Sequence, residues 1–443
     1  MNDLINSVLI IGNGISGVTA ARHIRKNSDI DITIISNETP YFFSRTALMY
    51  IYMGHMKFEA TKPYEDSFWK KNRINVVFDQ VTGIDEETNS VELANNNRIS
   101  YKYLIIACGS KPNKFGWPGQ ELEGVSGMYH LQDLERLEAL TPTINQGVIV
   151  GGGLIGIELA EMLQSRGVQV HYLVRESNFW NKVLPYEESK MVTQHILDHG
   201  VDLQLNTELN LIEPDSENRV KGVYTSKGEF IDCQYVGLTC GVSPNIDFLK
   251  ESNSRIKTDK GIIVNRFLQT NIENIYSIGD CAQHLHPFDQ RSRIESVWYT
   301  GRMMGETVAR TITGTKTAYQ PGHWFNSAKF FDIEYQTYGR VNANPSPNEI
   351  HLYWEHPKKN ISIRLAYDRI THKILGVLNM GVRLRHEVFD QWLNERREIL
   401  SVIEHFENSN FDPEFYANYT RMAKPTFYKH YEEIEKSELK RIL

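Results

Sequence analysis

Two glycine-rich turns, at residues 12–17 and 151–156, constrain this chain more than any other feature of its sequence. Each turn stands where a short apolar run gives way to a helical pattern, and each is followed by a second apolar run. This order is typical of a βαβ unit whose turn holds the pyrophosphate of a dinucleotide at the N-terminus of the helix. Two such units therefore predict two dinucleotides bound by one protein.

The glycines of each turn have different expected tasks. The first permits the tight turn, the second lets the backbone approach the pyrophosphate, and the third lets helix and strand pack closely. The residues expected to bind the two dinucleotides are Gly12, Gly14, Ile15, Ser16 and Gly17 in the first turn, and Gly152, Gly153, Leu154, Ile155 and Gly156 in the second.

Length and charge narrow the class of protein. A chain of 443 residues is expected to form about three domains. The formal net charge of −7 and the absence of a long basic tract argue against nucleic acid as a partner. No apolar stretch approaches the ~18 residues of a membrane span, and the first apolar run begins too early to leave room for a signal peptide. We expect a cytoplasmic protein with no transmembrane segment. A homodimer is possible.

Cysteine usage bears on the chemistry. Cys108, Cys233, Cys240 and Cys281 are far apart in the sequence, and none forms a Cys-x-x-Cys pair. We therefore expect no local dithiol centre and treat the four thiols as inert. The sequence also offers no cluster of cysteine and histidine at ligand spacing, His284 and His286 being typical of polar loop residues. No metal site is expected.

Three further segments show a buried strand that ends in small or acidic residues. The segment 103–112 contains Ala107 and Gly109, the segment 238–245 contains Gly241, and the segment 274–282 contains Gly279 and Asp280. An aspartate in such a place can accept hydrogen bonds from ribose or ribityl hydroxyls.

Taken in order, these five motifs resemble the pyridine nucleotide–disulfide oxidoreductase superfamily, over roughly residues 5–340. The resemblance implies an α/β fold with two Rossmann-like dinucleotide-binding domains, one for FAD and one for NAD(P)H, and an α+β C-terminal domain. It places the FAD domain at 1–117 and 243–317, the NAD(P)H domain at 118–242, and a C-terminal interface domain with a helical tail at 318–443. It also implies that Glu38 reaches the adenosine ribose of FAD and that Asp280 reaches the ribityl chain.

Within this superfamily, the segment 40–54 most resembles the ferredoxin, rubredoxin and nitrite reductase branch. Thr46 stands where some thiol-dependent members carry their redox cysteine, so a thiol mechanism is not expected. The lysine that ferredoxin reductases pair with the glutamate equivalent to Glu158 is replaced here by Met49 or Tyr50. Two segments, 293–297 and 324–327, resemble stretches that contact the flavin in ferredoxin reductases. The residues expected around the flavin are thus Arg45, Glu295, Ser296, Val297 and Trp324.

The end of the strand at 168–174 bears on the choice of nicotinamide. Val174 stands where NADH-using members carry a glutamate, and Arg175 follows it. An arginine there favours the 2′-phosphate of NADPH, although Arg175 and Glu176 would also make an ordinary surface ion pair. NADPH is slightly favoured over NADH.

The expected reaction is hydride transfer from nicotinamide C4 to flavin N5, with Glu158 and Arg45 as the catalytic candidates. Electrons then pass to a ferredoxin-like protein or to a small acceptor such as a quinone. The alternative is a flavoprotein similar to the apoptosis-inducing factor, which responds to NAD(P)H with slow turnover and acts through partner binding. Towards the C-terminus, the pattern predicts strands at 329–335, 361–367 and 375–379 and helices at 387–393 and 431–439.

Overall fold

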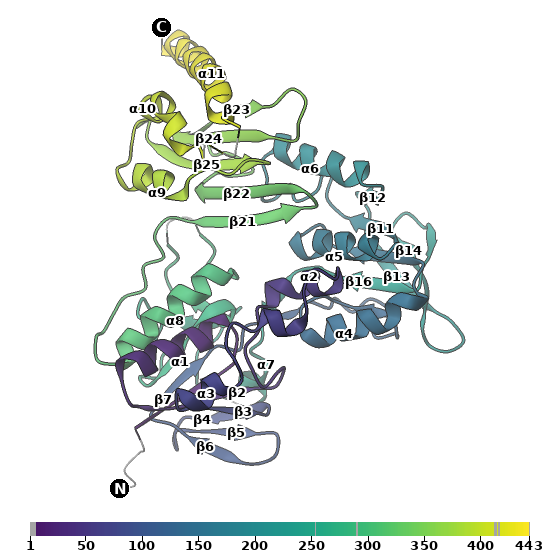
Figure 1. Ribbon diagram of the computed structural model, residues 1–443, viewed down its shortest axis with the longest axis vertical. Helices are drawn as coiled ribbons and strands as arrows, with labels where there is room; N and C mark the ends of the chain where they lie inside the picture. Colours follow the sequence, from purple (N-terminus) through teal and green to yellow (C-terminus); the bar gives the residue numbers. More distant parts are fainter. Residues whose placement is uncertain (1–5, 253, 289–290, 412–413, 415–416, 443) are drawn as a thin grey trace. The chain divides into compact units, whose positions relative to one another are not determined.

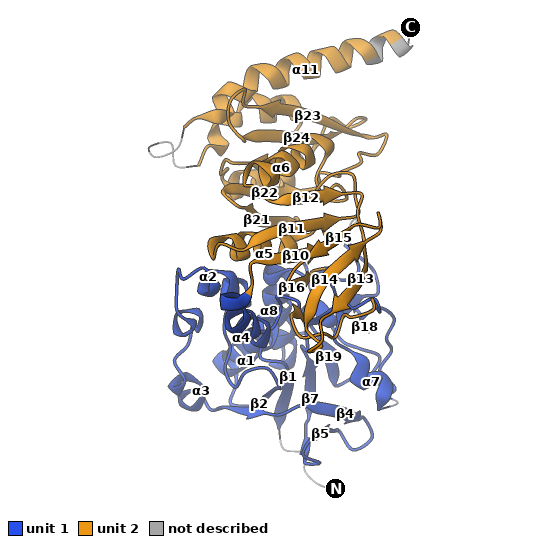
Figure 2. Ribbon diagram, turned by 90° about the vertical axis from the view of Figure 1, so that its right-hand side faces the viewer, with its two compact units in different colours: residues 1–116, 126–143, 240–321 blue, residues 117–125, 144–239, 322–443 orange. Residues whose placement is uncertain are grey.

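The computed structural model describes residues 6–252, 254–288, 291–411, 414 and 417–442. The chain divides into two compact units (Figure 2). The first unit comprises residues 1–116, 126–143 and 240–321, and the second comprises residues 117–125, 144–239 and 322–443.

A five-stranded parallel sheet organises the first unit (Figure 1). Its order is β19 (Ile275–Ser277), β7 (Tyr103–Ile106), β1 (Ser7–Ile11), β2 (Asp31–Ser36) and β3 (Ile74–Phe78). Because side chains alternate along a strand, Val8 and Ile10 of β1 enter one core while Leu9 and Ile11 enter another. The central strand is therefore buried on both faces.

Different elements cover the two faces of this sheet. Helices α1 (Ile15–Asn27) and α8 (Trp298–Ile312) pack together and bury Val18, Ala21, Met304 and Val308 in the first core. The other core includes residues of the antiparallel strands β4 (Val81–Asp85) and β5 (Ser90–Leu93), next to β6 (Arg98–Ser100), and of α7 (Asp247–Glu251). The smaller elements are α2 (Leu48–Tyr52), α3 (Ser67–Lys71), α4 (Leu131–Leu140), the antiparallel pair β8 (Ser110–Pro112) and β17 (Val242–Pro244), and the parallel pair β18 (Ile262–Val264) and β20 (Ala282–His284).

The second unit contains another five-stranded sheet, in which four neighbouring strands pair in parallel. Its order is β12 (Asp202–Leu205), β11 (Gln169–Val174), β10 (Gln146–Val150), β16 (Tyr235–Leu238) and β9 (Val125–Ser126). The same part of the chain forms helices α5 (Leu154–Ser165) and α6 (Tyr186–Asp198). A separate antiparallel sheet consists of β13 (Leu209–Pro214), β14 (Val220–Thr225) and β15 (Phe230–Asp232). The two glycine turns thus lie in two βαβ units of the same plan, and the predicted fold class is confirmed.

An antiparallel sheet completes the second unit. Its order is β21 (Phe325–Phe330), β22 (Ile333–Gly339), β25 (Ile374–Met380), β24 (Ser362–Asp368) and β23 (Glu349–Glu355), followed by α9 (His386–Asn394), α10 (Ile399–Glu404) and α11 (Tyr419–Ile442). This sheet and the second parallel sheet belong to one compact unit. The finer division at 118–242 and 318–443 stays a prediction.

Most predicted C-terminal elements are confirmed, but one is wrong. The strand at 375–379 and the helices at 387–393 and 431–439 fall within observed elements, and the strand at 361–367 matches β24 shifted by one residue. The single strand expected over 329–335 is instead a hairpin, because Phe331 adopts a φ of 54° and the chain turns back at Asp332. His284, expected in a loop, lies on β20, where it is buried and stacks on Tyr319.

The helices that the structure describes include none with the length and apolar character needed to cross a membrane.

Candidate cofactor sites

The first glycine turn combines a tightly packed backbone with one open position. A Cβ atom on Gly12, whose φ is +107°, would lie 2.2 Å from the carbonyl oxygen of Ala107. A Cβ on Gly17 would lie 2.1 Å from the carbonyl oxygen of Gly12. Gly14, the N-cap of α1, has no such neighbour within 4 Å. Space for a ligand is therefore left at the residue from which the helix begins.

The second turn repeats this geometry. Gly151 has a φ of +114°, and a Cβ on Gly156 would lie 2.3 Å from the Tyr172 hydroxyl oxygen. Gly153 is the N-cap of α5 and has nothing within 4 Å of its Cβ position. Gly152, a predicted binding residue, instead faces Val174, whose Cγ1 would lie 2.7 Å from a Cβ there. Both turns therefore leave the same backbone position open to a phosphate.

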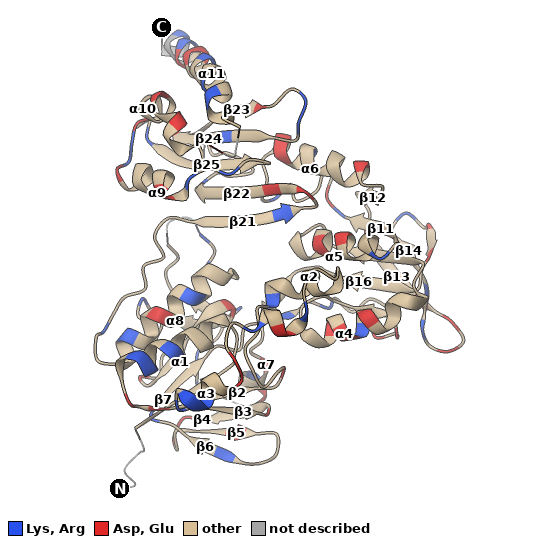
Figure 3. Ribbon diagram, in the orientation of Figure 1, with Lys and Arg blue, Asp and Glu red and all other residues tan. Residues whose placement is uncertain are grey.

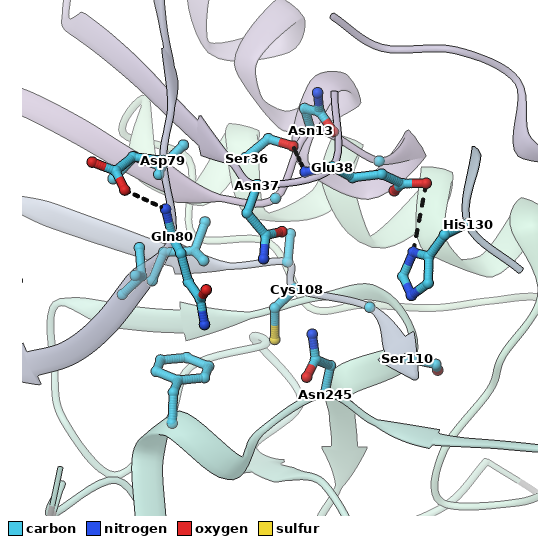
Figure 4. A pocket seen from close by; sticks show the side chains of 18 of the residues that line it. Asn13, Ser36, Asn37, Glu38, Asp79, Gln80, Cys108, Ser110, His130 and Asn245 are labelled. Carbon is cyan, nitrogen blue, oxygen red and sulfur yellow. Dashed lines mark hydrogen bonds and ion pairs between the residues drawn. The ribbon is translucent and has the colours of Figure 1, made fainter. Parts of the chain in front are cut away.

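A cavity of about 330 Å³ lies at the carboxyl edge of the first parallel sheet (Figure 4). Four consecutive strand ends supply its wall, through residues 11–14, 35–38, 79–81 and 107–110. The carboxyl edge is where open α/β sheets bind nucleotides. The structure brings together here, of the predicted residues, Gly12, Gly14, Glu38, Arg45, Ala107 and Gly109.

Glu38 is held by several donors on the wall of this cavity. The Arg45 guanidinium binds both of its carboxylate oxygens, with 2.8 Å between Nη1 and Oε1. The backbone N–H of Leu131 also donates to Oε1, at 3.0 Å. Burial by itself would raise the pKa of Glu38, but hydrogen bonds from His130 and Arg45 outweigh it and lower the pKa to about 2. Glu38 is thus an ionised acceptor at neutral pH.

Arg45 also contacts Tyr129. Its Nη1 donates to the carbonyl oxygen of Tyr129, and its guanidinium lies over the Tyr129 ring, 4.7 Å from the centroid. These contacts fix the segment after β2 to the turn before α4. The sequence predicted Arg45 beside the flavin, and the structure places it on the cavity wall as the partner of Glu38.

Asp280, in the segment after β19, contacts the segment that follows β7. The Ser110 hydroxyl donates to Asp280 Oδ2 at 3.1 Å, and burial raises the pKa of Asp280. The preceding Gly279 has a φ of +74°, and a Cβ there would lie 2.5 Å from Ser16 Oγ. Asp280, Gly279 and Ser16 therefore gather near the start of α1.

The predicted residues before α8 belong to a different environment. Glu295 is 3% exposed and lies 3.3 Å both from Arg291 Nη1 and from the Tyr319 hydroxyl. Burial raises the pKa of Glu295, and Arg291 opposes this. Glu295, Ser296 and Val297 are not part of the cavity wall at the first glycine turn. Their contact with a flavin stays a prediction, as does that of Trp324, which precedes β21 in the second unit.

Glu158 lies on α5, one turn after the open Gly153. Burial, and then the charge of Glu161, raise the pKa of Glu158 to about 7. Glu161 itself binds Lys329 of β21 at 3.1 Å. Glu158 is consequently a carboxyl group that changes its protonation near neutral pH, beside a predicted nicotinamide site.

Arg175 pairs with its sequence neighbour. Its Nε donates to Glu176 Oε1 at 2.9 Å, and Lys182 Nζ lies 3.1 Å from the same oxygen. The Arg175 side chain is 62% exposed. The surface-pair alternative is therefore formed in the structure, and the preference between NADPH and NADH is left undecided.

Several residues of the cavity wall were not among those predicted from the sequence. They share no local motif and come from strand ends, from the turn before α4 and from the segment before α7. They are Tyr129 and, labelled in Figure 4, Asn13, Asn37, Asp79, Gln80, Cys108, His130 and Asn245. Residues 79 and 80 directly follow β3, so an apolar run recognised at 74–78 would have indicated them.

Two of the four cysteines meet in the fold. Cys108 and Cys281 are not isolated, because a hydrogen bond joins their thiols and, together with burial, raises the pKa of Cys108. Both thiols are free. They meet because β7 and the segment after β19 end at the same edge of the sheet.

Residues 6–305 match the family model described as pyridine nucleotide-disulphide oxidoreductase. The chain belongs to this family. It is an FAD-dependent NAD(P)H oxidoreductase, and the open positions at Gly14 and Gly153 fit two dinucleotides. Like the predicted fold class, the predicted membership of this superfamily is confirmed.

Similar proteins include several reductases of electron-transfer systems. The ferredoxin reductase subunit of a 5,5′-dehydrodivanillate O-demethylase from Sphingobium sp. is 29% identical over 341 residues, which cover 76% of this chain and 82% of that protein. Rhodocoxin reductase of Rhodococcus erythropolis is 29% identical over 330 residues, which cover 73% and 76%. The crystal structure of the ferredoxin reductase for the CYP199A2 system of Rhodopseudomonas palustris has a TM-score of 0.77 at 22% identity, covering 85% of this chain and 91% of that one, and shows the shared fold.

Proposed function

We propose that this oxidoreductase passes electrons from NADPH or NADH, by way of FAD, to a small electron-transfer protein of the ferredoxin type. The observation that carries the proposal is the match to ferredoxin and rhodocoxin reductases over about three quarters of the chain. A small acceptor such as a quinone is the alternative destination of the electrons.

The first unit would hold FAD through backbone and carboxylate groups. The amides at the start of α1 would donate to the pyrophosphate beside Gly14, where no side chain obstructs the approach. Glu38 would accept hydrogen bonds from the adenosine ribose while Arg45 keeps it in place. Bound FAD supplies an acceptor for a hydride that can release its two electrons one at a time.

The second unit would hold the nicotinamide dinucleotide in the same manner, at Gly153 and the start of α5. Glu158 would orient the nicotinamide, as acceptor when ionised and as donor when protonated. Glu295, Ser296, Val297 and Trp324 remain the proposed residues around the flavin, whereas Arg45 would act at the adenosine ribose through Glu38.

The charge distribution is compatible with an acidic protein partner. The net charge of −7 slows the encounter with an acidic ferredoxin. Helices α1 and α8, however, carry several exposed basic residues, among them Arg22, Lys26 and Arg310 (Figure 3). A local basic surface can steer association even when the whole protein is acidic, and the rate should then fall with ionic strength.

The test is anaerobic rapid mixing of the flavin-loaded protein with NADPH and with NADH, followed by a panel of acceptors. We expect fast bleaching of the flavin absorbance, then faster reoxidation by a [2Fe–2S] ferredoxin or a rubredoxin than by O₂ or a quinone. Fastest reoxidation by a quinone would contradict the protein partner. A long-lived charge-transfer complex with little turnover by any acceptor would contradict the reductase function and favour a role similar to that of the apoptosis-inducing factor.

A further inference from the structure

Two histidines and an aspartate converge in the second unit, on helix α6 and the β21–β22 turn. His195 and His199 are four residues apart at the end of α6, and Asp332 occupies the hairpin turn. His195 Nε2 lies 2.5 Å and His199 Nε2 lies 3.8 Å from Asp332 Oδ1. One ligand atom from each side chain falls within 4.8 Å of the others. Residues four apart on a helix share a face, which explains why both rings reach the same turn.

A backbone contact fixes the tautomer of His199. Its Nδ1 lies 2.9 Å from the carbonyl oxygen of His195. A carbonyl oxygen only accepts, so Nδ1 carries the hydrogen and donates it. In the neutral ring, the lone pair is then on Nε2, which is the nitrogen turned toward Asp332.

His195 has a side-chain partner that can support either tautomer. The amide nitrogen Nδ2 of Asn360 lies 3.1 Å from His195 Nδ1. In that orientation the amide donates to Nδ1, but rotation of the amide by about 180° turns its oxygen toward an Nδ1–H group and leaves the Nε2 lone pair for a cation. Support of this kind, from a second group bound to the far nitrogen, is typical of histidines that bind metals.

Asp332, the third residue of the cluster, lies near the two histidines and is exposed to solvent. The Phe331 ring stacks on the His199 ring, with centroids 4.3 Å apart and planes at 18°. This contact anchors the turn beside the helix end. The Asp332 side chain is 79% exposed and His199 is 34% exposed, whereas His195 is 7% exposed. An ion could therefore enter from solvent.

We propose that His195, His199 and Asp332 bind a divalent transition-metal ion of the Zn²⁺ type. Two imidazole nitrogens and a carboxylate oxygen are common zinc ligands, at about 2.0–2.2 Å, and a tetrahedral site places such atoms roughly 3.3 Å apart. The gaps of 2.5 and 3.8 Å bracket this value. Small movements of the exposed Asp332 would even them, and a fourth position would remain for water.

This site opposes the expectation that the chain binds no metal. A His-x-x-x-His pair is visible in the sequence, but its third member is 133 positions beyond His199 (332 − 199) and is contributed by a hairpin that was predicted as one strand. The bound ion would join α6 to the β21–β22 hairpin. It should therefore stabilise the second unit, independently of the flavin chemistry.

The test uses full-length, flavin-loaded protein stripped with a chelator and then titrated with ZnCl₂ by calorimetry, with Co²⁺ as a spectroscopic probe. We expect one Zn²⁺ per chain, a rise in melting temperature, and visible Co²⁺ bands of a four-coordinate site. Absence of binding to the wild-type protein would overturn the proposal.

Two variants and a matched control locate the site. His199→Ala and Asp332→Asn should each weaken Zn²⁺ binding more than about tenfold. His405→Ala is the control, since His405 also caps a helix, with its Nδ1 2.8 Å from the carbonyl oxygen of Ser401, but has no part in the cluster. Unchanged flavin absorbance would confirm that the variants fold. Equal Zn²⁺ affinity in all three variants and the wild type would show that the ion binds elsewhere and would overturn the proposal.

Discussion

The carboxylate of Glu38 and the guanidinium of Arg45 form a two-point ion pair on the wall of the cavity at the first parallel sheet. From the sequence, Glu38 was expected at the adenosine ribose and Arg45 at the flavin. The structure makes them one unit, because the segment after β2 folds back so that Arg45 meets Glu38. A carboxylate held in this way is ionised and preoriented to accept hydrogen bonds.

Replacing Glu38 by Gln should weaken FAD binding and remove an acid-sensitive contribution to stability. The pKa of Glu38 is lowered from 4.5 to about 2, so its contribution is present above pH 4.5 and is lost as the pH falls toward 2. The shift corresponds to roughly 3 kcal/mol at neutral pH. Thermal melts between pH 7 and pH 2 would measure this, with the exposed Glu59→Gln as control. Parallel pH profiles for Glu38→Gln and wild type would refute the prediction.

The two open glycines allow the two cofactor sites to be tested separately. Gly14 and Gly153 have φ values of −70° and −118°, and a Cβ at either position meets nothing within 4 Å. A valine should therefore leave the fold intact while blocking a pyrophosphate. Gly14→Val should yield protein without flavin absorbance, and Gly153→Val should keep the flavin but weaken NAD(P)H binding by more than about tenfold. Circular dichroism and equilibrium titration measure both. Retention of both cofactors at wild-type affinity would show that the pyrophosphates lie elsewhere.

Glu158 should give the nicotinamide half-reaction a pH dependence near neutrality. Burial and Glu161 raise its pKa to about 7. We expect an inflection near pH 7 in the dissociation constant or rate of flavin reduction, absent in Glu158→Gln. Glu161→Gln should move the inflection to lower pH, because it removes a neighbouring negative charge.

The same group affects stability with the opposite sign to Glu38. Because the folded pKa of Glu158 is raised, its contribution is fully present below pH 4.5 and is lost as the pH rises through about 7. Relative to Glu158→Gln, the wild-type protein should lose up to about 3 kcal/mol between pH 4.5 and pH 8. Denaturant unfolding at several pH values measures this, and a constant difference between the two proteins would contradict the raised pKa.

Arg175→Glu should shift the coenzyme preference toward NADH, by roughly tenfold in the ratio of kcat/KM values. The reason is that Arg175 would exchange its bond to Glu176 for one to the 2′-phosphate of NADPH, which a glutamate repels. Lys182→Glu is a useful control, because Lys182 binds the same Glu176 oxygen but follows the strand end at a greater distance in sequence. An unchanged NADPH/NADH ratio in Arg175→Glu would show that Arg175 is only the surface partner of Glu176.

The spacing of residues in the sequence was sufficient to predict those elements that depend only on neighbouring residues. The turns at 12–17 and 151–156 follow from backbone sterics within single βαβ units, so both open N-caps could be predicted from glycine positions. The strands at 361–367 and 375–379 were likewise evident from apolar runs, whereas the hairpin at Phe331 was not, because an apolar residue with a positive φ leaves no turn signal.

The sequence by itself thus determined the two dinucleotide units and the family. Only the tertiary structure decided which distant side chains meet. Arg45 reaches a carbonyl 84 residues away at Tyr129, and His195 reaches Asp332 across 137 residues. The physical reason is range: a turn depends on neighbouring dihedral angles and can be recognised from local residues. A contact between remote side chains depends on how whole helices and sheets pack, which no local pattern encodes.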